Sequence, residues 1–224
     1  MGAMPAAEYI PRIDQMAPQR LEVALFGMGC FLGFEPRFGI TRGIWRTFVG
    51  YSGGRFTAPT YDDHGDHTEA VLVEYDPLTI SYGQLLELFL LWLSPSKGTA
   101  VTPLRPQNSS IFVKNETERR LAQAALKRYD FHTGTSLHTR VLAFKTFYKA
   151  ESWCQKYFLR TCPLMQELEH IYRSEESLLE SPLATRLNGI LGNASSSPSI
   201  PEDIEFYDLS EHAVHALKRL CGTE

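Results

Sequence analysis

The chain has 224 residues, 43% of them hydrophobic, and a formal net charge of −4 at pH 7. This length and composition predict a globular protein with a sizeable core rather than a disordered chain. The acidic balance gives no basic footprint, and no apolar run is long enough for a membrane span, so we expect no nucleic-acid or membrane partner. Because the first 19 residues hold no apolar stretch, we expect no secretory signal and a cytoplasmic location.

The first predicted strand leads through a glycine-rich turn into a predicted helix. Residues 21–26 form a short apolar run, which predicts a core strand, and phenylalanines recur at helical spacing over residues 31–38. Between them lies the sequence Gly-Met-Gly-Cys, which ends at Cys30. Cys30 is therefore predicted to lie where a strand feeds the N-terminus of a helix.

The chain from there to residue 163 alternates between strand and helix patterns. Hydrophobic residues at a period of two predict strands, and those at a period near 3.6 predict helices. In order, we predict strands at 44–51 and 69–75, a helix capped by Ser81 and Gln84, a strand at 109–113, a helix from about 115 to 129, a strand at 140–147 and a helix at 150–159. This order predicts an α+β fold, a two-layer sandwich of helices against a mostly antiparallel sheet.

The pattern changes after Pro163, and we divide the chain accordingly. The predicted parts are an arm over residues 1–19, a central domain over 20–163 and a helical C-terminal extension over 164–224. Within the extension a Ser/Pro linker is predicted near residues 193–202, followed by a final amphipathic helix.

Four cysteines are present, Cys30, Cys154, Cys162 and Cys221, and no two of them have Cys-x-x-Cys spacing. This spacing predicts neither a zinc ribbon nor a thioredoxin-type motif. Cys30 has the position of a reactive thiol, because a thiol attacks only as the thiolate and the N-terminus of a helix favours negative charge. The histidines and aspartates of the loop at 55–67 are better explained as a solvated polar loop than as ligands, so no metal site is predicted.

Several short motifs in a fixed order relate the chain to a known family. They include Gly29-Cys30-Phe31-Leu32-Gly33, Gly50-Tyr51-Ser52-Gly53-Gly54, Ala58-Pro59-Thr60-Tyr61, Gly65-Asp66-His67-Thr68-Glu69 and Phe147-Tyr148-Lys149-Ala150-Glu151. The first resembles the Gly-Cys-Phe-Trp-Gly nucleophile motif of the A-type peptide methionine sulfoxide reductases. The resemblance runs from about Leu21 to Pro163, and it implies that the central domain is catalytic and has that family's ferredoxin-like sandwich.

The resemblance also implies a chemistry and a set of roles. The chain would be a thiol-dependent reductase of the (S)-S-oxide of methionine, in which Cys30 attacks the sulfoxide sulfur and Glu69 donates a proton to its oxygen. Tyr61 would hydrogen-bond the same oxygen. Burial would raise the pKa of Glu69 and so suit it to this role. Cys30 would be left as a sulfenic acid, and an external thiol or a thioredoxin-like protein, rather than a bound cofactor, would reduce it.

The chain departs from the family around the substrate pocket, which we expect Phe31, Leu32, Gln107 and Cys154 to line. Leu32 stands where the family has the tryptophan that forms an apolar wall with Phe31. Gln107 falls where the family has a tyrosine, in a segment that also lacks the family's aspartate, and Cys154 replaces a histidine. We therefore expect a wider pocket and a changed choice of substrate.

The family's glycine-rich C-terminal segment with resolving cysteines is absent from this sequence. Cys221 is our candidate resolving thiol, because a flexible linker of about ten residues spans roughly 15–20 Å on average. Cys154, Cys162 and direct reduction by an external thiol remain alternatives.

Three functions stay open on the sequence alone. The first is reduction of methionine (S)-S-oxide, and the second is the same thiol chemistry on another small oxidised sulfur or selenium compound. The third is a non-enzymatic descendant that binds methionine or a peptide. The presence of Cys30, Glu69 and Tyr61 together argues against the third, because a binding module has no chemical need for all of them.

Overall fold

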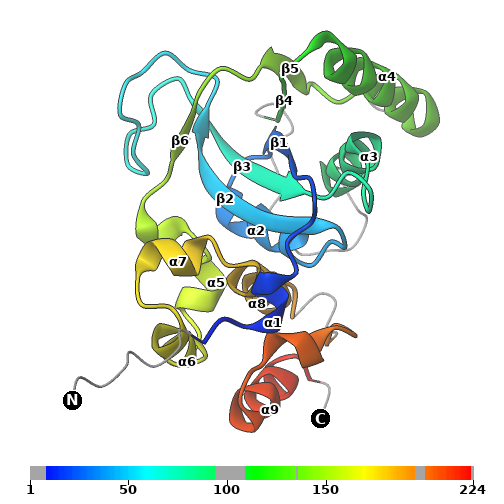
Figure 1. Ribbon diagram of the computed structural model, residues 1–224. Coiled ribbons are helices and arrows are strands. Elements are labelled where there is room, and N and C mark those ends of the chain that lie inside the picture. The colour runs from blue at the N-terminus through cyan, green and yellow to red at the C-terminus, as the bar shows by residue number, and fades with distance from the viewer. Residues whose placement is uncertain (1–8, 94–108, 135, 195–199, 223–224) are drawn as a thin grey trace.

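The computed structural model describes residues 9–93, 109–134, 136–194 and 200–222, and Figure 1 shows their arrangement. Six strands form one sheet in the order β5-β4-β1-β3-β2-β6. The strands are β1 (Glu22–Gly27), β2 (Ile44–Ser52), β3 (Thr68–Tyr75), β4 (Ser110–Val113), β5 (Arg140–Ala143) and β6 (Phe147–Lys149). Every pair is antiparallel except β4 with β5. The predicted α+β sandwich with a mostly antiparallel sheet is confirmed.

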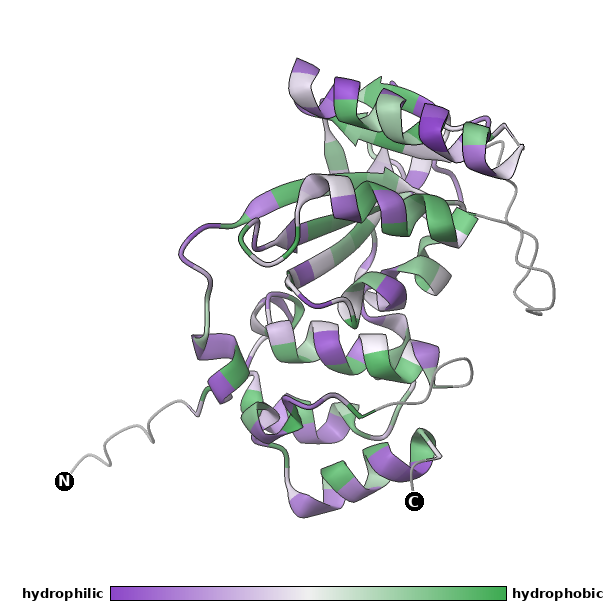
Figure 2. Ribbon diagram, turned by 90° about the vertical axis from the view of Figure 1, so that its right-hand side faces the viewer, coloured by the Kyte–Doolittle hydropathy of each residue, from purple (hydrophilic) through white to green (hydrophobic). Residues whose placement is uncertain are grey.

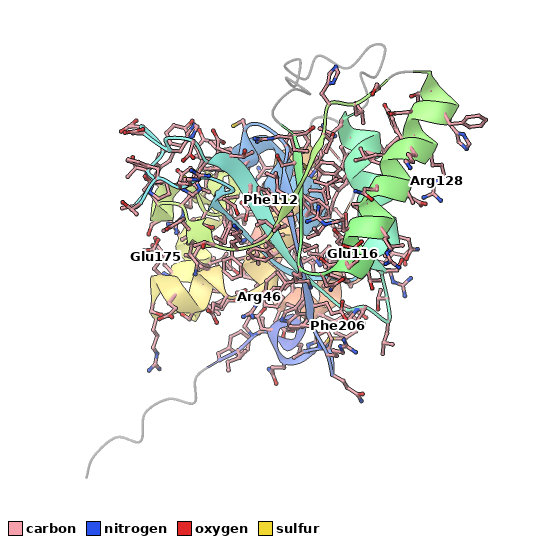
Figure 3. The ribbon with its side chains drawn as sticks, turned by 90° about the horizontal axis from the view of Figure 1, so that it is seen from above. Arg46, Phe112, Glu116, Arg128, Glu175 and Phe206 are labelled. Carbon is pink, nitrogen blue, oxygen red and sulfur yellow. The ribbon has the colours of Figure 1, made fainter. Side chains whose placement is uncertain are left out.

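Three helices cover one face of this sheet: α2 (Phe31–Gly39), α3 (Tyr82–Leu93) and α4 (Glu116–Thr133). Their apolar side chains form the main core with alternate residues of β1 to β4, such as Phe26 and Val71. The intervening strand residues face the other way and form a smaller cluster around Phe112, which is labelled in Figure 3. Because side chains alternate in direction along each strand, apolar residues lie on both faces of the sheet.

The predicted helix caps on this face are present. Ser81 Oγ accepts a hydrogen bond from the backbone N–H of Gln84, and Gln84 Oε1 accepts one from the N–H of Ser81, so the capping box before α3 is confirmed. Asn115 likewise caps α4 by accepting from the N–H of Glu118.

The single strand predicted over residues 140–147 is wrong as one element. It is divided into β5, which pairs with β4 at one edge of the sheet, and β6, which pairs with β2 at the other edge. Leu142, Phe144 and Phe147 all pack against the cluster around Phe112. Leu142 and Phe144 agree with the alternating pattern, but Phe147 lies an odd number of residues further on, so the alternation does not continue through the change of pairing partner.

The helix predicted over residues 150–159 is also wrong in its continuity. The chain forms a short 3-10 helix, η2 (Ser152–Cys154), and then α5 (Tyr157–Arg160). Between them Lys156 takes a left-handed conformation with φ of +53°. This break turns the buried Lys156 side chain toward Glu35 of α2, where the two form an ion pair.

The C-terminal part of the chain builds a second core below the sheet. Its helices are α6 (Met165–Ile171), α7 (Glu175–Leu179), α8 (Pro182–Asn193), η3 (Ile204–Tyr207) and α9 (Glu211–Leu220), and the N-terminal α1 (Arg12–Gln15) joins them through Ile13. Figure 2 shows hydrophobic and hydrophilic residues mixed along these helices, as expected where a helix buries one side. Helix α8 is instead buried along most of its length, because it packs on both α2 and this core. The part of the predicted linker at residues 195–199 lies outside the described residues, and the predicted boundaries at 20 and 164 stay a prediction.

Helix α8 packs closely against α2 and so supports the helix that follows Cys30. A Cβ atom added at Gly189 would lie 2.7 Å from the backbone of Gly39, and one added at Gly39 would lie 2.6 Å from the Thr185 carbonyl oxygen. Only glycine at these two positions lets the helices approach this closely. In the part of the chain that the structure describes, no helix has the length and hydropathy of a membrane span.

Candidate active site

Cys30 lies at the turn between β1 and α2, as predicted. It is the N-cap residue of α2, its side chain is exposed, and it makes no capping hydrogen bond. Gly29, with φ of +84°, provides the turn before it, a conformation that glycine adopts without steric penalty. The thiol is therefore free for reaction at the end of a helix that favours negative charge.

Glu69 reaches the same end of α2 from the middle of the sheet. It lies near the start of β3, opposite Tyr51 of β2, and its Oε2 accepts a hydrogen bond of 3.0 Å from the backbone N–H of Phe31. Burial raises the pKa of Glu69, while this hydrogen bond and the charge of His64 oppose the rise. The carboxyl group is therefore adjacent to Cys30 and is shifted toward its protonated form.

Tyr61 approaches the site from the loop between β2 and β3. Its ring meets the ring of Phe31 edge to face at 6.3 Å between centroids. Partial burial raises the pKa of Tyr61, and the charges of Cys30 and Glu69 raise it further. The structure thus brings together the three residues expected to carry the chemistry, Cys30, Glu69 and Tyr61.

Asp66 and His67, two of the polar residues of this loop, have structural partners. Both carboxylate oxygens of Asp66 accept from the N–H of Arg55, and one also accepts from the N–H of Phe56. His67 accepts from the N–H of Gly54 through Nδ1. Among the residues that the structure describes, no group of three or more His, Cys, Asp and Glu side chains is placed to hold a metal ion.

The residues expected to line the pocket lie in different surroundings. Phe31 is buried in the main core, and Leu32 is half-buried against it. Cys154 is fully buried; this burial raises the pKa of its thiol to about 12, and the charges of Glu151, Glu69 and Cys30 add to the rise. Cys154 is therefore a neutral thiol close to the site, and Gln107 lies outside the described residues.

The structure does not bring Cys221 to Cys30. Cys221 is buried in the second core at the end of α9, which Figure 1 places at the opposite end of the molecule from the turn between β1 and α2. Burial also raises the pKa of its thiol. Cys162 is half-buried against the same core. A resolving role for Cys221 stays a prediction, and it requires α9 to leave its place.

Three further residues at the site were not identified from the sequence: Tyr51, His64 and Glu151. The Tyr51 ring is fully buried between Phe31, at 5.8 Å between centroids, and His64, at 6.1 Å. Its hydroxyl group donates to Glu151, which also accepts from the backbone of Tyr61. Tyr51 and Glu151 lie within motifs quoted above, but a motif alone does not indicate that they meet.

Comparisons with known proteins agree with this arrangement. A family model described as peptide methionine sulfoxide reductase matches residues 22–183. The peptide methionine sulfoxide reductase of Drosophila melanogaster is 36% identical over 190 residues, which cover 84% of this chain and 75% of that protein. Peptide methionine sulfoxide reductase A5 of Arabidopsis thaliana is 39% identical over 180 residues, which cover 77% of this chain and 69% of that protein.

Two solved structures have a fold similar to that of this chain. Methionine sulfoxide reductase A of Corynebacterium diphtheriae superposes with a TM-score of 0.53 and 25% identity, over 66% of this chain and 78% of that one. Reduced Mxr1 from Saccharomyces cerevisiae has the same TM-score at 23% identity, over 66% of this chain and 88% of that one, which supports the fold alone. With a family match over most of its length, the chain belongs to the peptide methionine sulfoxide reductase family.

Proposed function

We propose that the protein reduces the (S)-S-oxide of methionine in peptides to methionine, with Cys30 as nucleophile and Glu69 as acid. The observation that carries these roles is the hydrogen bond between Glu69 and the first N–H of the helix that Cys30 caps. It holds a carboxyl group of raised pKa beside an exposed thiol. A proton donor beside a sulfur nucleophile is what reduction of a sulfoxide requires.

The reaction is a two-electron transfer between two sulfur atoms. The Cys30 thiolate forms a bond to the sulfoxide sulfur, while the Glu69 carboxyl donates its proton to the sulfoxide oxygen. Oε2 of Glu69 is engaged with the backbone, which leaves Oε1 to carry that proton. When the oxygen moves to Cys30, the thioether leaves with the electron pair, so methionine is reduced and Cys30 is oxidised to a sulfenic acid.

The Tyr61 hydroxyl group completes the environment of the oxygen. A tyrosine hydroxyl group is protonated at neutral pH, and burial raises the pKa of Tyr61 further, so it can donate a hydrogen bond to the same oxygen as negative charge develops there. A neutral donor at this position stabilises the transition state more than the ground state, which is the condition for a faster reaction.

The proposal includes an external reductant in place of a bound cofactor. A thiol attacks the sulfenic acid of Cys30 to form a disulfide and water, and a second thiol then releases Cys30. A small thiol or a thioredoxin-like protein supplies both electrons. The reduced thiols of the cytoplasm match this need, and a cytoplasmic location is part of the proposal.

A turnover experiment without reductant tests the proposed function. A peptide that contains methionine (S)-S-oxide is mixed with the reduced protein, and the methionine formed in the peptide is quantified by chromatography. We expect about one methionine per chain without thiol, continuous turnover after addition of dithiothreitol, and no reaction with the R epimer. A Cys162→Ser variant, altered away from the site, should behave like the wild type. Absence of methionine in both conditions would exclude the proposed activity.

Replacing Glu69 with glutamine is expected to lower the turnover rate by about 10²- to 10⁴-fold, the usual contribution of general acid catalysis. Glutamine still accepts the hydrogen bond from the N–H of Phe31 but has no acidic proton to donate. The pH profile of kcat/KM should also change. In the wild type kcat/KM should fall as pH rises through the raised pKa of Glu69, because the acid loses its proton. The variant should not show this fall.

The same substitution is expected to raise thermal stability at pH 7. Because the pKa of Glu69 is higher in the folded than in the unfolded state, its contribution to stability is full below the unfolded pKa and is lost as pH rises through the folded pKa. Glutamine cannot ionise, so the variant does not lose this stability as the pH rises. Melting curves should show the variant above the wild type at pH 7 and level with it below pH ~4. A variant that melts lower at pH 7 would contradict the assignment of a destabilised carboxylate.

A further inference from the structure

We propose that the segment from Glu151 to Trp153 positions Tyr61 for the reaction, with Glu151 holding its backbone and Trp153 holding its ring. The inference rests on the proposed function, because it concerns the geometry of the hydroxyl group that meets the sulfoxide oxygen. Neither residue touches Cys30 in the described contacts, so both act through Tyr61.

Glu151 joins the Tyr61 loop to a rigid part of the core. Its Oε1 accepts a hydrogen bond of 2.8 Å from the backbone N–H of Tyr61, and its Oε2 accepts one of 2.9 Å from the hydroxyl group of Tyr51. Partial burial opposes the charge on Glu151, but these hydrogen bonds outweigh it and hold its pKa below the usual range. Glu151 is therefore a charged acceptor at neutral pH, and hydrogen bonds to a charged group are the stronger kind.

Tyr61 needs such a support because of where it lies. It belongs to the long connection between β2 and β3, and the residue is 38% exposed. The hydrogen bonds of Asp66 and His67 secure residues 54–56 and 66–67, and hydrogen bonds between Thr60 and Asp63 close a turn around Tyr61 within the loop itself. Glu151 links this turn to the core. A donor on a loop contributes to catalysis only if its hydroxyl group stays within a fraction of an ångström of the reacting oxygen.

Trp153 packs against the ring of Tyr61. The two rings meet edge to face with centroids 4.7 Å apart, and the Tyr61 ring meets Phe31 at 6.3 Å. Trp153 is nevertheless 48% exposed. A single exposed aromatic residue needs no special explanation. Here, however, its ring completes a row of three in which the middle ring is Tyr61, and such contacts fix ring orientation.

The supporting segment is itself anchored to the sheet. The Gln155 side chain accepts from the N–H of Val49 at 3.0 Å and donates to the carbonyl groups of Val49 and Ala150 at 2.8 Å and 3.0 Å. Cys154, between Trp153 and Gln155, is fully buried. The two groups that hold Tyr61 therefore project from a short turn fixed on β2, and rigid support of this kind preserves catalytic geometry.

A double-mutant cycle tests whether both residues act through Tyr61. We expect Tyr61→Phe to lower kcat by about 10- to 100-fold, and Glu151→Ala and Trp153→Ala by about tenfold each, with KM for a small sulfoxide changed less than twofold. In the Tyr61→Phe background, adding Glu151→Ala or Trp153→Ala should lower kcat by less than about twofold more. Trp153→Phe should recover most of the wild-type rate, because it keeps an edge-to-face contact.

Hydrogen exchange of a peptide that spans residues 57–63 gives a readout independent of turnover. Exchange should be faster in Glu151→Ala and Trp153→Ala than in the wild type, and unchanged in Phe131→Ala and Glu169→Ala, which alter exposed side chains on α4 and α6. Fully multiplicative losses of kcat, or unchanged exchange in both variants, would overturn the inference. If the wild type itself shows no turnover, the proposed function fails, and the exchange rates still decide whether the segment holds Tyr61.

Discussion

Replacing Cys30 with serine is expected to abolish methionine sulfoxide reduction, with kcat/KM lowered by at least about 10⁴-fold. A serine hydroxyl group is not ionised at neutral pH and forms no stable equivalent of the sulfenic acid, so both the attack and the transfer of oxygen are lost. The fold should not suffer, because Cys30 is exposed and makes no capping hydrogen bond. Serine is a preferred N-cap residue, so the variant should melt at the wild-type temperature or above it.

The measurement is thiol-dependent formation of methionine from a peptide sulfoxide, together with a melting curve of each protein. Cys162→Ser and Cys221→Ser are informative companions, because both thiols belong to the second core. In the single turnover without reductant, neither should reduce the yield of methionine. A Cys30→Ser protein that keeps more than about a tenth of the wild-type rate would assign the nucleophile to another residue.

The rate of continuous turnover by Cys221→Ser tests whether Cys221 is the resolving thiol. If Cys221 resolves the sulfenic acid, the variant should stall with thioredoxin as reductant and recover with a small thiol. The buried position of Cys221 instead favours direct reduction of Cys30, since α9 would have to leave the second core before its thiol could reach the site. Cys154 is nearer, but the high pKa of its thiol leaves little thiolate for attack.

The parts of the fold that were predicted correctly are those that local sequence specifies. The alternation of Val71, Val73 and Tyr75 predicts one buried face of β3, and Ser81 with Gln84 predicts the start of α3; both are confirmed. Cys30 lies where the sequence predicts it for the same reason, because an apolar strand, two glycines and a helical pattern surround it within a few residues. Periodicity and capping depend on residues within one or two helical turns of each other, so the local sequence is sufficient to predict these elements.

The parts that were missed depend on contacts between distant segments. Glu151 meets Tyr61 and Tyr51 across 90 and 100 residues of chain, and nothing near Glu151 in the sequence indicates either partner. The division of residues 140–147 into β5 and β6 likewise depends on which strands stand at the sheet edges. The predicted helix at 150–159 is interrupted because burial of Lys156 against Glu35 prevails over local helix preference.

That buried ion pair is the basis of the second large prediction: Lys156→Ala should lower the free energy of unfolding by about 3–5 kcal/mol. The Lys156 Nζ atom lies 2.6 Å from Oε1 of Glu35, and both side chains are almost completely buried. Nζ also donates to the carbonyl and hydroxyl oxygens of Thr47, and Asn188 of α8 donates to the other oxygen of Glu35. Burial lowers the pKa of Lys156, and the Glu35 carboxylate opposes this. Removing the ammonium group would leave Glu35 charged and unpaired inside the core.

Urea unfolding of the wild type and variants measures this loss. Arg120→Ala is the matched control, because it removes an exposed ion pair with Glu116 and should change stability by less than about 0.5 kcal/mol. The double variant Glu35→Gln/Lys156→Met should be more stable than Lys156→Ala, since it leaves no unpaired charge. Because Glu35 lies one turn into α2, the Lys156→Ala protein should also lose activity at temperatures where the wild type is folded. If Lys156→Ala instead unfolds with the wild-type midpoint, the ion pair does not hold α2 against β2 and α8.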